Sequence, residues 1–176
     1  MNYAEIKNFD IANGLGIRVS LFVSGCTHRC KNCFNSIAWD FNYGKPFTKE
    51  VEDSIIEMLS KPSVSGLTLL GGEPMEPVNQ MGLIDFLRRV KKEVPNKNIW
   101  CYTGYTLEQI FSTIATDNFD IRVYKQEIIK MCDVLVDGRY VDELRDLTLR
   151  FRGSSNQRVI DVKQTLNENK IILYDN

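Results

Sequence analysis

Short apolar runs alternate with amphipathic segments along most of this chain, and this alternation restricts the possible folds more than any other feature. Several of the apolar runs are continuous, as expected of parallel strands that are buried on both faces of a sheet. We expect strands at residues 17–23, 66–70, 98–103, 133–137, 158–162 and 170–174. The alternation predicts an α/β fold with mostly parallel strands.

The segments between these runs have the character of helices. Helices are expected at residues 48–60, 78–94 and 123–131. Thr106, followed three residues later by Gln109, is a capping-box signature, so another helix is predicted to begin there and continue through Ile110 and Ile114. Strands followed by helices indicate a parallel sheet, either open or part of an incomplete (β/α) barrel, with the chemistry at the carboxyl ends of the strands.

The length and the charge of the chain narrow the possible functions. A chain of 176 residues fits a single domain, residues 1–176, with one active site. The formal net charge of -1 provides no overall basic field for nucleic-acid binding. The first residues lack a signal-peptide pattern, and no run approaches the roughly 18 apolar residues of a membrane span. We therefore expect a soluble, cytoplasmic protein that binds neither nucleic acid nor membrane.

Three of the five cysteines, Cys26, Cys30 and Cys33, lie within eight positions directly after the first expected strand. This spacing suits a metal site in a reducing compartment better than a disulfide framework. A structural zinc site needs four ligands, and only His28 could supply a fourth one nearby. Three thiolates can instead hold three irons of a 4Fe-4S cluster and leave the fourth iron open to an exogenous ligand. We favour the cluster over zinc and interpret His28 as a loop residue.

Few other residues are candidates for catalysis or metal binding. His28 is the only histidine, which excludes a Ser-His-Asp triad or an HExxH zinc site unless it supplies the sole imidazole. Cys101 and Cys132 lie in or beside apolar strands and are expected to be buried thiols. Several arginines could dock a partner protein, bind carboxylates or simply form a solvated face; they are Arg139, Arg145, Arg150, Arg152 and Arg158.

A second motif, Gly71-Gly72-Glu73-Pro74, follows the second expected strand. Two glycines allow a backbone to approach a ligand closely, and the Glu73 carboxylate can bind a cation. Alone, the motif could be an ordinary turn at the end of a strand. Together, CxxxCxxC and GGE resemble the signature of the radical S-adenosylmethionine (SAM) superfamily, in which the GGE segment holds the methionyl ammonium of SAM.

Residues 13–18, 100–105 and 133–139 further resemble the glycyl-radical-enzyme activating proteins of that superfamily. Within them, the short length and residues 149–158 are most similar to the branch that activates anaerobic ribonucleoside-triphosphate reductase. The resemblance implies a truncated (β/α) barrel with SAM across the strand ends. It also implies reductive cleavage of SAM at a 4Fe-4S cluster, a glycyl radical formed on a large reductase subunit, and reduced flavodoxin or ferredoxin as electron donor.

The same resemblance implies which residues contact SAM. They are Asn32, Cys33 and Phe34 beside the cluster, then Gly71, Gly72, Glu73, Thr103, Asp137 and Arg139. Thr103 could instead form hydrogen bonds with backbone groups at the end of a strand, and Asp137 could accept hydrogen bonds from local backbone in a turn. Larger activators have a lysine at the position of Arg139 and a later SAM-contacting histidine, so the far wall of this site is expected to differ.

Two enzymatic alternatives and two non-enzymatic ones stay open. The chain could activate another glycyl radical enzyme of the pyruvate formate-lyase type, or it could be a small-molecule radical SAM enzyme. A non-enzymatic electron carrier or a zinc-bound interaction module would leave residues 71–73 without a role.

Overall fold

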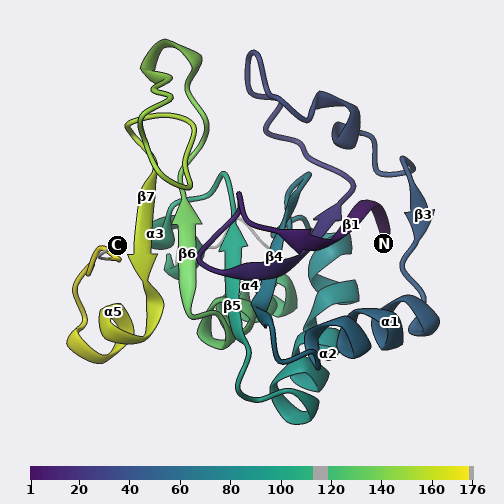
Figure 1. Ribbon diagram of the computed structural model, residues 1–176. Helices are drawn as coiled ribbons and strands as arrows, with labels where there is room; N and C mark the ends of the chain where they lie inside the picture. Colours follow the sequence, from purple (N-terminus) through teal and green to yellow (C-terminus); the bar gives the residue numbers. More distant parts are fainter. Residues whose placement is uncertain (113–118, 175–176) are drawn as a thin grey trace.

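The computed structural model describes residues 1–112 and 119–174, in which seven strands form one sheet (Figure 1). The strands are β1 (Asn2–Asp10), β2 (Ile17–Val23), β3 (Lys45–Pro46), β4 (Val64–Gly71), β5 (Asn98–Tyr102), β6 (Val134–Asp137) and β7 (Arg158–Asp161). Their order across the sheet is β3-β1-β2-β4-β5-β6-β7. Strands β2, β4, β5 and β6 pair in parallel, whereas β1 and β7 run antiparallel to their neighbours. The fold is therefore mixed α/β with a mostly parallel sheet, as predicted.

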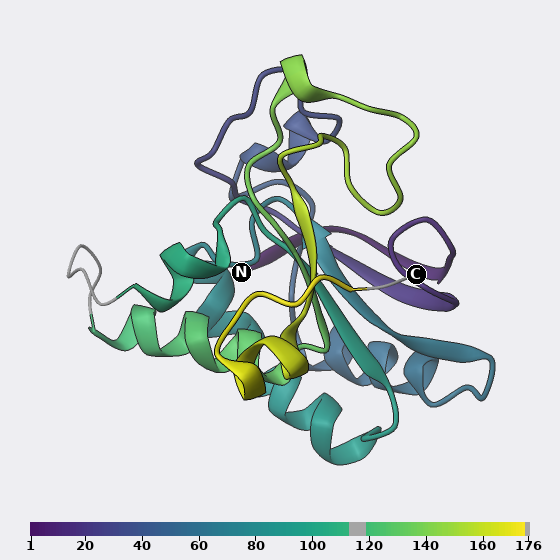
Figure 2. The same ribbon diagram turned by 90° about the vertical axis from the view of Figure 1, so that its left-hand side faces the viewer.

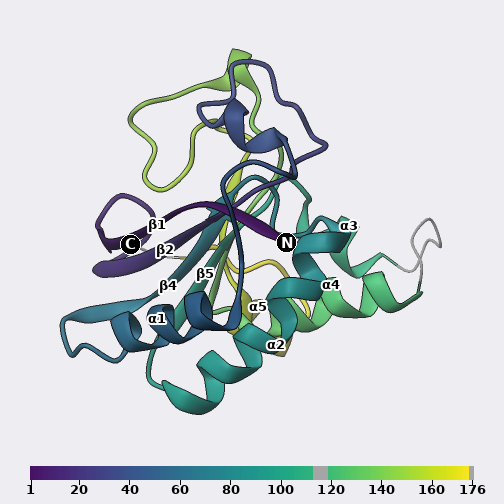
Figure 3. The ribbon, with the colours of Figure 1, turned by 90° about the vertical axis from the view of Figure 1, so that its right-hand side faces the viewer.

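The helices are α1 (Lys49–Leu59), α2 (Pro77–Glu93), α3 (Leu107–Phe111), α4 (Phe119–Met131) and α5 (Val162–Glu168), with the short 3-10 helices η1 (Ser36–Trp39) and η2 (Asp142–Leu144). Helices α1 to α4 cover one face of the sheet (Figure 3). None of the helices in the described ranges is long and apolar enough to cross a membrane.

Alternate residues of the central strands face opposite sides of the sheet. The side toward the helices is apolar and fully buried, and its strand residues include Val19, Leu21, Leu67, Leu69, Ile99, Cys101 and Leu135. Cys101 and Cys132 are buried free thiols, which confirms the prediction. On the other side, the Trp100 ring packs against Phe151 and Tyr174, so loops cover that face in place of helices.

Two long loops rise beyond the carboxyl ends of the parallel strands (Figures 1 and 2). One connects β2 to β3 and carries the three clustered cysteines; we call residues 26–34 the cysteine loop. The other, the 138–157 loop, connects β6 to β7. Hydrogen bonds from Lys31 to Glu143 and from Asn32 to Asp142 join the two loops. Parallel pairing therefore brings segments that are distant in sequence to one edge of the sheet.

The structure differs from the expected elements at the edges of the sheet. Strand β1 was not expected; it is half exposed and polar, and it lacks a continuous apolar run. Residues 170–174 form no full strand, because only Leu173 makes an isolated bridge, to Ile160. Strand β7 stops at Asp161, whose side chain accepts a hydrogen bond from Gln164 N at 2.8 Å and so caps α5.

The third expected helix is shorter than predicted. The capping box of Thr106 and Gln109 is present, and α3 begins directly after Thr106 but ends at Phe111. Ile114, through which the helix was expected to continue, lies outside the described residues. The sequence therefore located the start of this helix and not its end.

A buried arginine fastens the segment before β2 to the sheet. The Arg18 guanidinium is fully buried and donates to Thr68 Oγ1 at 2.6 Å, to Asn98 Oδ1 at 2.8 Å and to the carbonyl oxygens of Leu67 and Leu15 at 2.7 and 3.1 Å. It also stacks on the Trp100 ring. Burial lowers the pKa of Arg18 to about 10, so the side chain stays charged at neutral pH.

Replacement of Arg18 by methionine should lower the free energy of unfolding by roughly 2 to 4 kcal/mol, because each buried acceptor left without a donor costs about 1 to 3 kcal/mol. Urea denaturation measures the loss. The control is Arg88→Met, since Arg88 is half exposed and pairs with Asp85 and Glu127 at the surface; its loss should stay under about 1 kcal/mol. Equal losses in the two variants would contradict the structural role of Arg18.

Candidate functional site

A pocket of about 500 Å³ opens at the carboxyl ends of the central strands, between the two long loops. Most of the residues predicted from the sequence line it, namely Cys26, Cys30, Asn32, Cys33, Phe34, Gly71, Gly72, Glu73 and Thr103. Asp137 and Arg139 line a neighbouring pocket of about 470 Å³ instead. The structure thus brings the cysteines and the Gly-Gly-Glu turn to one cavity and places the last two predicted residues beside it.

The three cysteines of the loop are free and partly exposed. In the described ranges, no three histidine, cysteine, aspartate or glutamate side chains converge where a single metal ion could be held. A cubane cluster needs no such convergence, because each thiolate binds a different iron. The donor set therefore fits a 4Fe-4S cluster better than one zinc ion. Burial raises the pKa of the Cys26 thiol to about 11, so iron binding there must displace a proton.

Glu73 lies at the centre of the site with a side chain that is 1% exposed. Its Oε1 accepts hydrogen bonds from Met75 N at 2.8 Å and from Thr103 Oγ1 at 2.7 Å. Its Oε2 accepts one from Gly104 N at 2.7 Å. A carboxylate has about four acceptor positions, so these three donors leave one on Oε2, the oxygen beside which His28 Nε2 also lies. Thr103 thus contacts Glu73 and does not merely end a strand.

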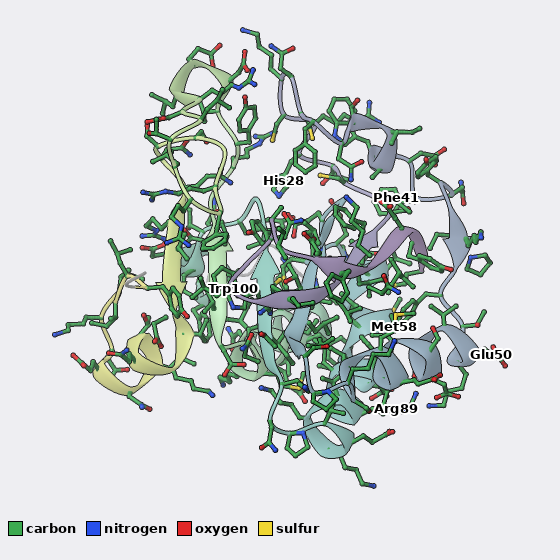
Figure 4. The ribbon with its side chains drawn as sticks, viewed as in Figure 1. His28, Phe41, Glu50, Met58, Arg89 and Trp100 are labelled. Atoms are coloured by element: carbon green, nitrogen blue, oxygen red, sulfur yellow. The ribbon has the colours of Figure 1, made fainter. Side chains whose placement is uncertain are left out.

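His28 belongs to the cysteine loop, and its side chain lies on the side of the loop that faces the ends of the strands (Figure 4). Its Nε2 atom is 3.0 Å from Glu73 Oε2, although the alignment of a hydrogen bond is not met. The ring also packs edge-on against Tyr105. A Cβ atom at Gly104 would come within 2.4 Å of the imidazole, so any larger residue there would require the His28 ring to move. His28 belongs to the contacts between loops, and the sequence did not reveal its proximity to Glu73.

The two glycines of the turn allow close approach of two backbones. Gly71 has a φ of +107°, and a Cβ there would lie 2.7 Å from Phe22 Cα. A Cβ at Gly72 would lie 2.5 Å from Gly25 O. Without side chains, the turn can bond to the segment that leads into Cys26, with Glu73 N donating to Gly25 O at 2.8 Å. The glycines therefore join the two motifs, in addition to any contact with a ligand.

Asp137 and Arg139 have partners within the protein. Asp137 is fully buried and accepts hydrogen bonds from Leu107 N at the start of α3 and from Arg158. Arg158 also makes a bidentate contact with Glu108 and thereby lowers the pKa of that carboxyl to about 2. The Arg139 side chain donates to the backbone carbonyl of His28. Arg139 therefore connects the 138–157 loop to the cysteine loop.

The pocket also contains residues that the sequence analysis did not select. The Tyr102 hydroxyl is buried in the pocket wall without a hydrogen-bond partner among the described residues. Burial raises its pKa, so it remains a neutral phenol that can donate and accept. Phe151, with a positive φ of 60°, forms another part of the wall. Period-2 alternation could have identified Tyr102, because it follows Trp100 on the same side of β5.

Comparisons with known proteins agree with this geometry. Residues 12–160 match the family described as a 4Fe-4S single cluster domain. The chain is 40% identical over 161 residues to the anaerobic ribonucleoside-triphosphate reductase-activating protein of Escherichia coli K12, which covers 90% of this chain and 97% of that protein. Identity to the proteins of the same name is 41% over 159 residues in Vibrio cholerae (89% and 96% covered) and 39% over 160 residues in Enterobacteria phage T4 (90% and 93%). The chain therefore belongs to the family of anaerobic ribonucleoside-triphosphate reductase-activating proteins and carries a 4Fe-4S single cluster domain.

Proposed function

We propose that the protein cleaves SAM at a 4Fe-4S cluster held by Cys26, Cys30 and Cys33 and thereby activates an anaerobic ribonucleoside-triphosphate reductase. One observation carries the proposal: three free thiols and the Gly-Gly-Glu turn line a single pocket at the carboxyl ends of parallel strands. The names of the relatives support the large reductase as partner.

When bound and reduced, a cluster held by Cys26, Cys30 and Cys33 would supply one electron for the cleavage of SAM to methionine and a 5'-deoxyadenosyl radical, and this radical would take a hydrogen atom from a glycine Cα of the reductase. The three thiols hold the cluster, and the remaining acceptor position on Glu73 receives the methionyl ammonium. Gly71 and Gly72 place backbone groups beside the ligand. Thr103 keeps the Glu73 carboxylate in position through its hydrogen bond.

The remaining predicted residues have roles at the rim of the pocket. Asn32 bonds to Asp142 and holds the cysteine loop against the 138–157 loop. Phe34 is 87% exposed at the pocket mouth, where it can cover SAM or contact the reductase. Asp137 and Arg139, which line the neighbouring pocket, bind Arg158 and the His28 carbonyl and so help to hold the loops around the SAM pocket. No side chain has to act as a general acid or base.

We also assign the chain to the radical SAM superfamily, as one domain with a truncated (β/α) barrel. The parallel order β2-β4-β5-β6 with a pocket at its carboxyl ends supports this assignment. Reduced flavodoxin or ferredoxin is proposed as electron donor. Because all five cysteines are free thiols, the reducing cytoplasm is proposed as the location of the protein.

The reconstituted, dithionite-reduced protein should convert SAM to methionine and 5'-deoxyadenosine without oxygen. Mixed with an anaerobic ribonucleotide reductase from the same source, it should produce a stable glycyl radical signal in electron paramagnetic resonance (EPR). A zinc-loaded, cluster-free preparation is the control and should be inactive. A radical formed only on a pyruvate formate-lyase type partner would exclude the proposed partner, and turnover by the zinc form would exclude the mechanism.

Serine substitutions at Cys26, Cys30 or Cys33 should each reduce iron retention and abolish SAM cleavage, because hydroxyls are poor ligands for iron-sulfur clusters. Cys101→Ala and Cys132→Ala are the matched controls, since both thiols are fully buried away from the pocket. They should retain iron but unfold at lower temperature, because truncation leaves a cavity. His28→Ala should also retain iron. Iron analysis and thermal unfolding distinguish these outcomes.

Glu73→Gln should weaken SAM binding by on the order of tenfold or more while leaving iron content nearly intact, since a hydrogen bond to a charged group contributes about 1.5 to 3 kcal/mol. Glutamine is preferable to alanine, because its amide oxygen can still accept from Met75 N and Thr103 Oγ1, whereas alanine would leave these two donors and Gly104 N all without their acceptor. Equilibrium binding of SAM to the reconstituted protein gives the measurement. Unchanged affinity would place the ammonium elsewhere.

A further inference from the structure

A second buried glutamate contacts the cysteine loop. Glu76, immediately before the first turn of α2, is 4% exposed. Its Oε1 atom accepts two hydrogen bonds from Thr27, one from the backbone N at 2.7 Å and one from Oγ1 at 2.6 Å. Thr27 directly follows Cys26, the first of the three cysteines. A charged acceptor at the base of a core helix therefore holds the residue next to a cluster ligand.

Asn79, one turn further along α2, holds the other side of Cys26. Its fully buried side chain donates to Ser24 O at 3.0 Å and to Glu73 O at 2.9 Å. Backbone hydrogen bonds from Gly25 N to Ala38 O at 2.8 Å and from Cys26 N to Trp39 O at 3.2 Å complete the support. The backbone on both sides of Cys26 is thus attached to the protein interior.

The other end of the cysteine loop is held differently. Lys31 pairs with Glu143 at 2.9 Å, but both side chains are about two-thirds exposed, at 69% and 65%. The bond from Asn32 to Asp142 also lies at the surface. Exposed pairs of this kind add only about 0 to 1 kcal/mol. Cys30 and Cys33 therefore lie on a segment with weaker anchors than Cys26.

We propose that Glu76 is a positioning residue that, through Thr27, fixes Cys26 before the cluster is assembled. Cys26 then serves as the preformed ligand, and Cys30 and Cys33 close around the metal centre from a more adaptable segment. This role rests on the proposed cluster site. The anchor itself is a property of the cluster-free chain, so it can be tested without iron.

Two variants of Glu76 and one control separate the effect of the hydrogen bonds from Thr27 from the effect of the Glu76 charge. Glu76→Met keeps the length of the side chain but removes the acceptor. Glu76→Gln keeps an acceptor oxygen but removes the same charge, so a difference between the two reports the hydrogen bonds. Glu57→Met, at an exposed position of α1, is the control for a general effect of the substitution.

The cluster-free, reduced variants are compared by hydrogen exchange at the Thr27 amide and by the rate at which iodoacetamide alkylates each cysteine. In Glu76→Met, exchange at Thr27 and alkylation of Cys26 should rise by about tenfold or more, with less than about a twofold change at Cys30 and Cys33. Glu76→Gln should restore both rates to within about threefold of wild type, because its amide oxygen still accepts from Thr27. Glu57→Met should match wild type.

If Glu76→Met left both Thr27 exchange and Cys26 alkylation unchanged, the proposal that Glu76 positions Cys26 would be overturned, even if the variant still assembled a cluster. Equal increases in the methionine and glutamine variants would overturn it as well, because they would report charge alone. If Glu76→Met does not fold, Thr27→Val replaces it; loss of the hydroxyl donor should raise Cys26 alkylation by about threefold, and an unchanged rate would overturn the proposal. Failure of the wild-type protein to hold a cluster would instead refute the proposed function.

Discussion

The Glu73 carboxylate joins three segments that are far apart in the sequence and that together form the pocket. It is almost completely buried, and a buried carboxylate is tolerated only when hydrogen-bond donors satisfy it. Met75, Thr103 and Gly104 supply those donors, while His28 of the cysteine loop lies beside it. The turn and the end of β5 are therefore held together by one side chain, against which the cysteine loop lies.

Parallel pairing explains why these segments meet at all. Strands β2, β4 and β5 run in the same direction, so the loops that follow them emerge at one edge of the sheet. Helices cover one face, and loops held partly by Arg18 and Trp100 cover the other. The pocket between these loops combines thiols, a carboxylate and apolar walls, a combination suited to binding a charged cofactor.

The central part of the fold could be predicted because its residues are strongly patterned. Strand β2 and helices α1 and α2 lie at or within one residue of their predicted bounds, since continuous apolar runs and amphipathic stripes reflect burial directly. The edges were less predictable. Strand β1 is half exposed and therefore lacks such a run, and the antiparallel direction of β7 depends on pairing with β6, which local sequence does not encode.

The sequence by itself determined the α/β class, the three clustered thiols, the Gly-Gly-Glu turn and the capping box of α3. Each of these depends on residues that lie close together along the chain, where spacing alone carries the information. Only the tertiary structure decided that Glu73 holds Thr103, that Glu76 holds Thr27 and that Asp137 binds Arg158. These contacts join residues 30, 49 and 21 positions apart, and such partners become neighbours only after strand pairing has brought their loops to the same edge of the sheet.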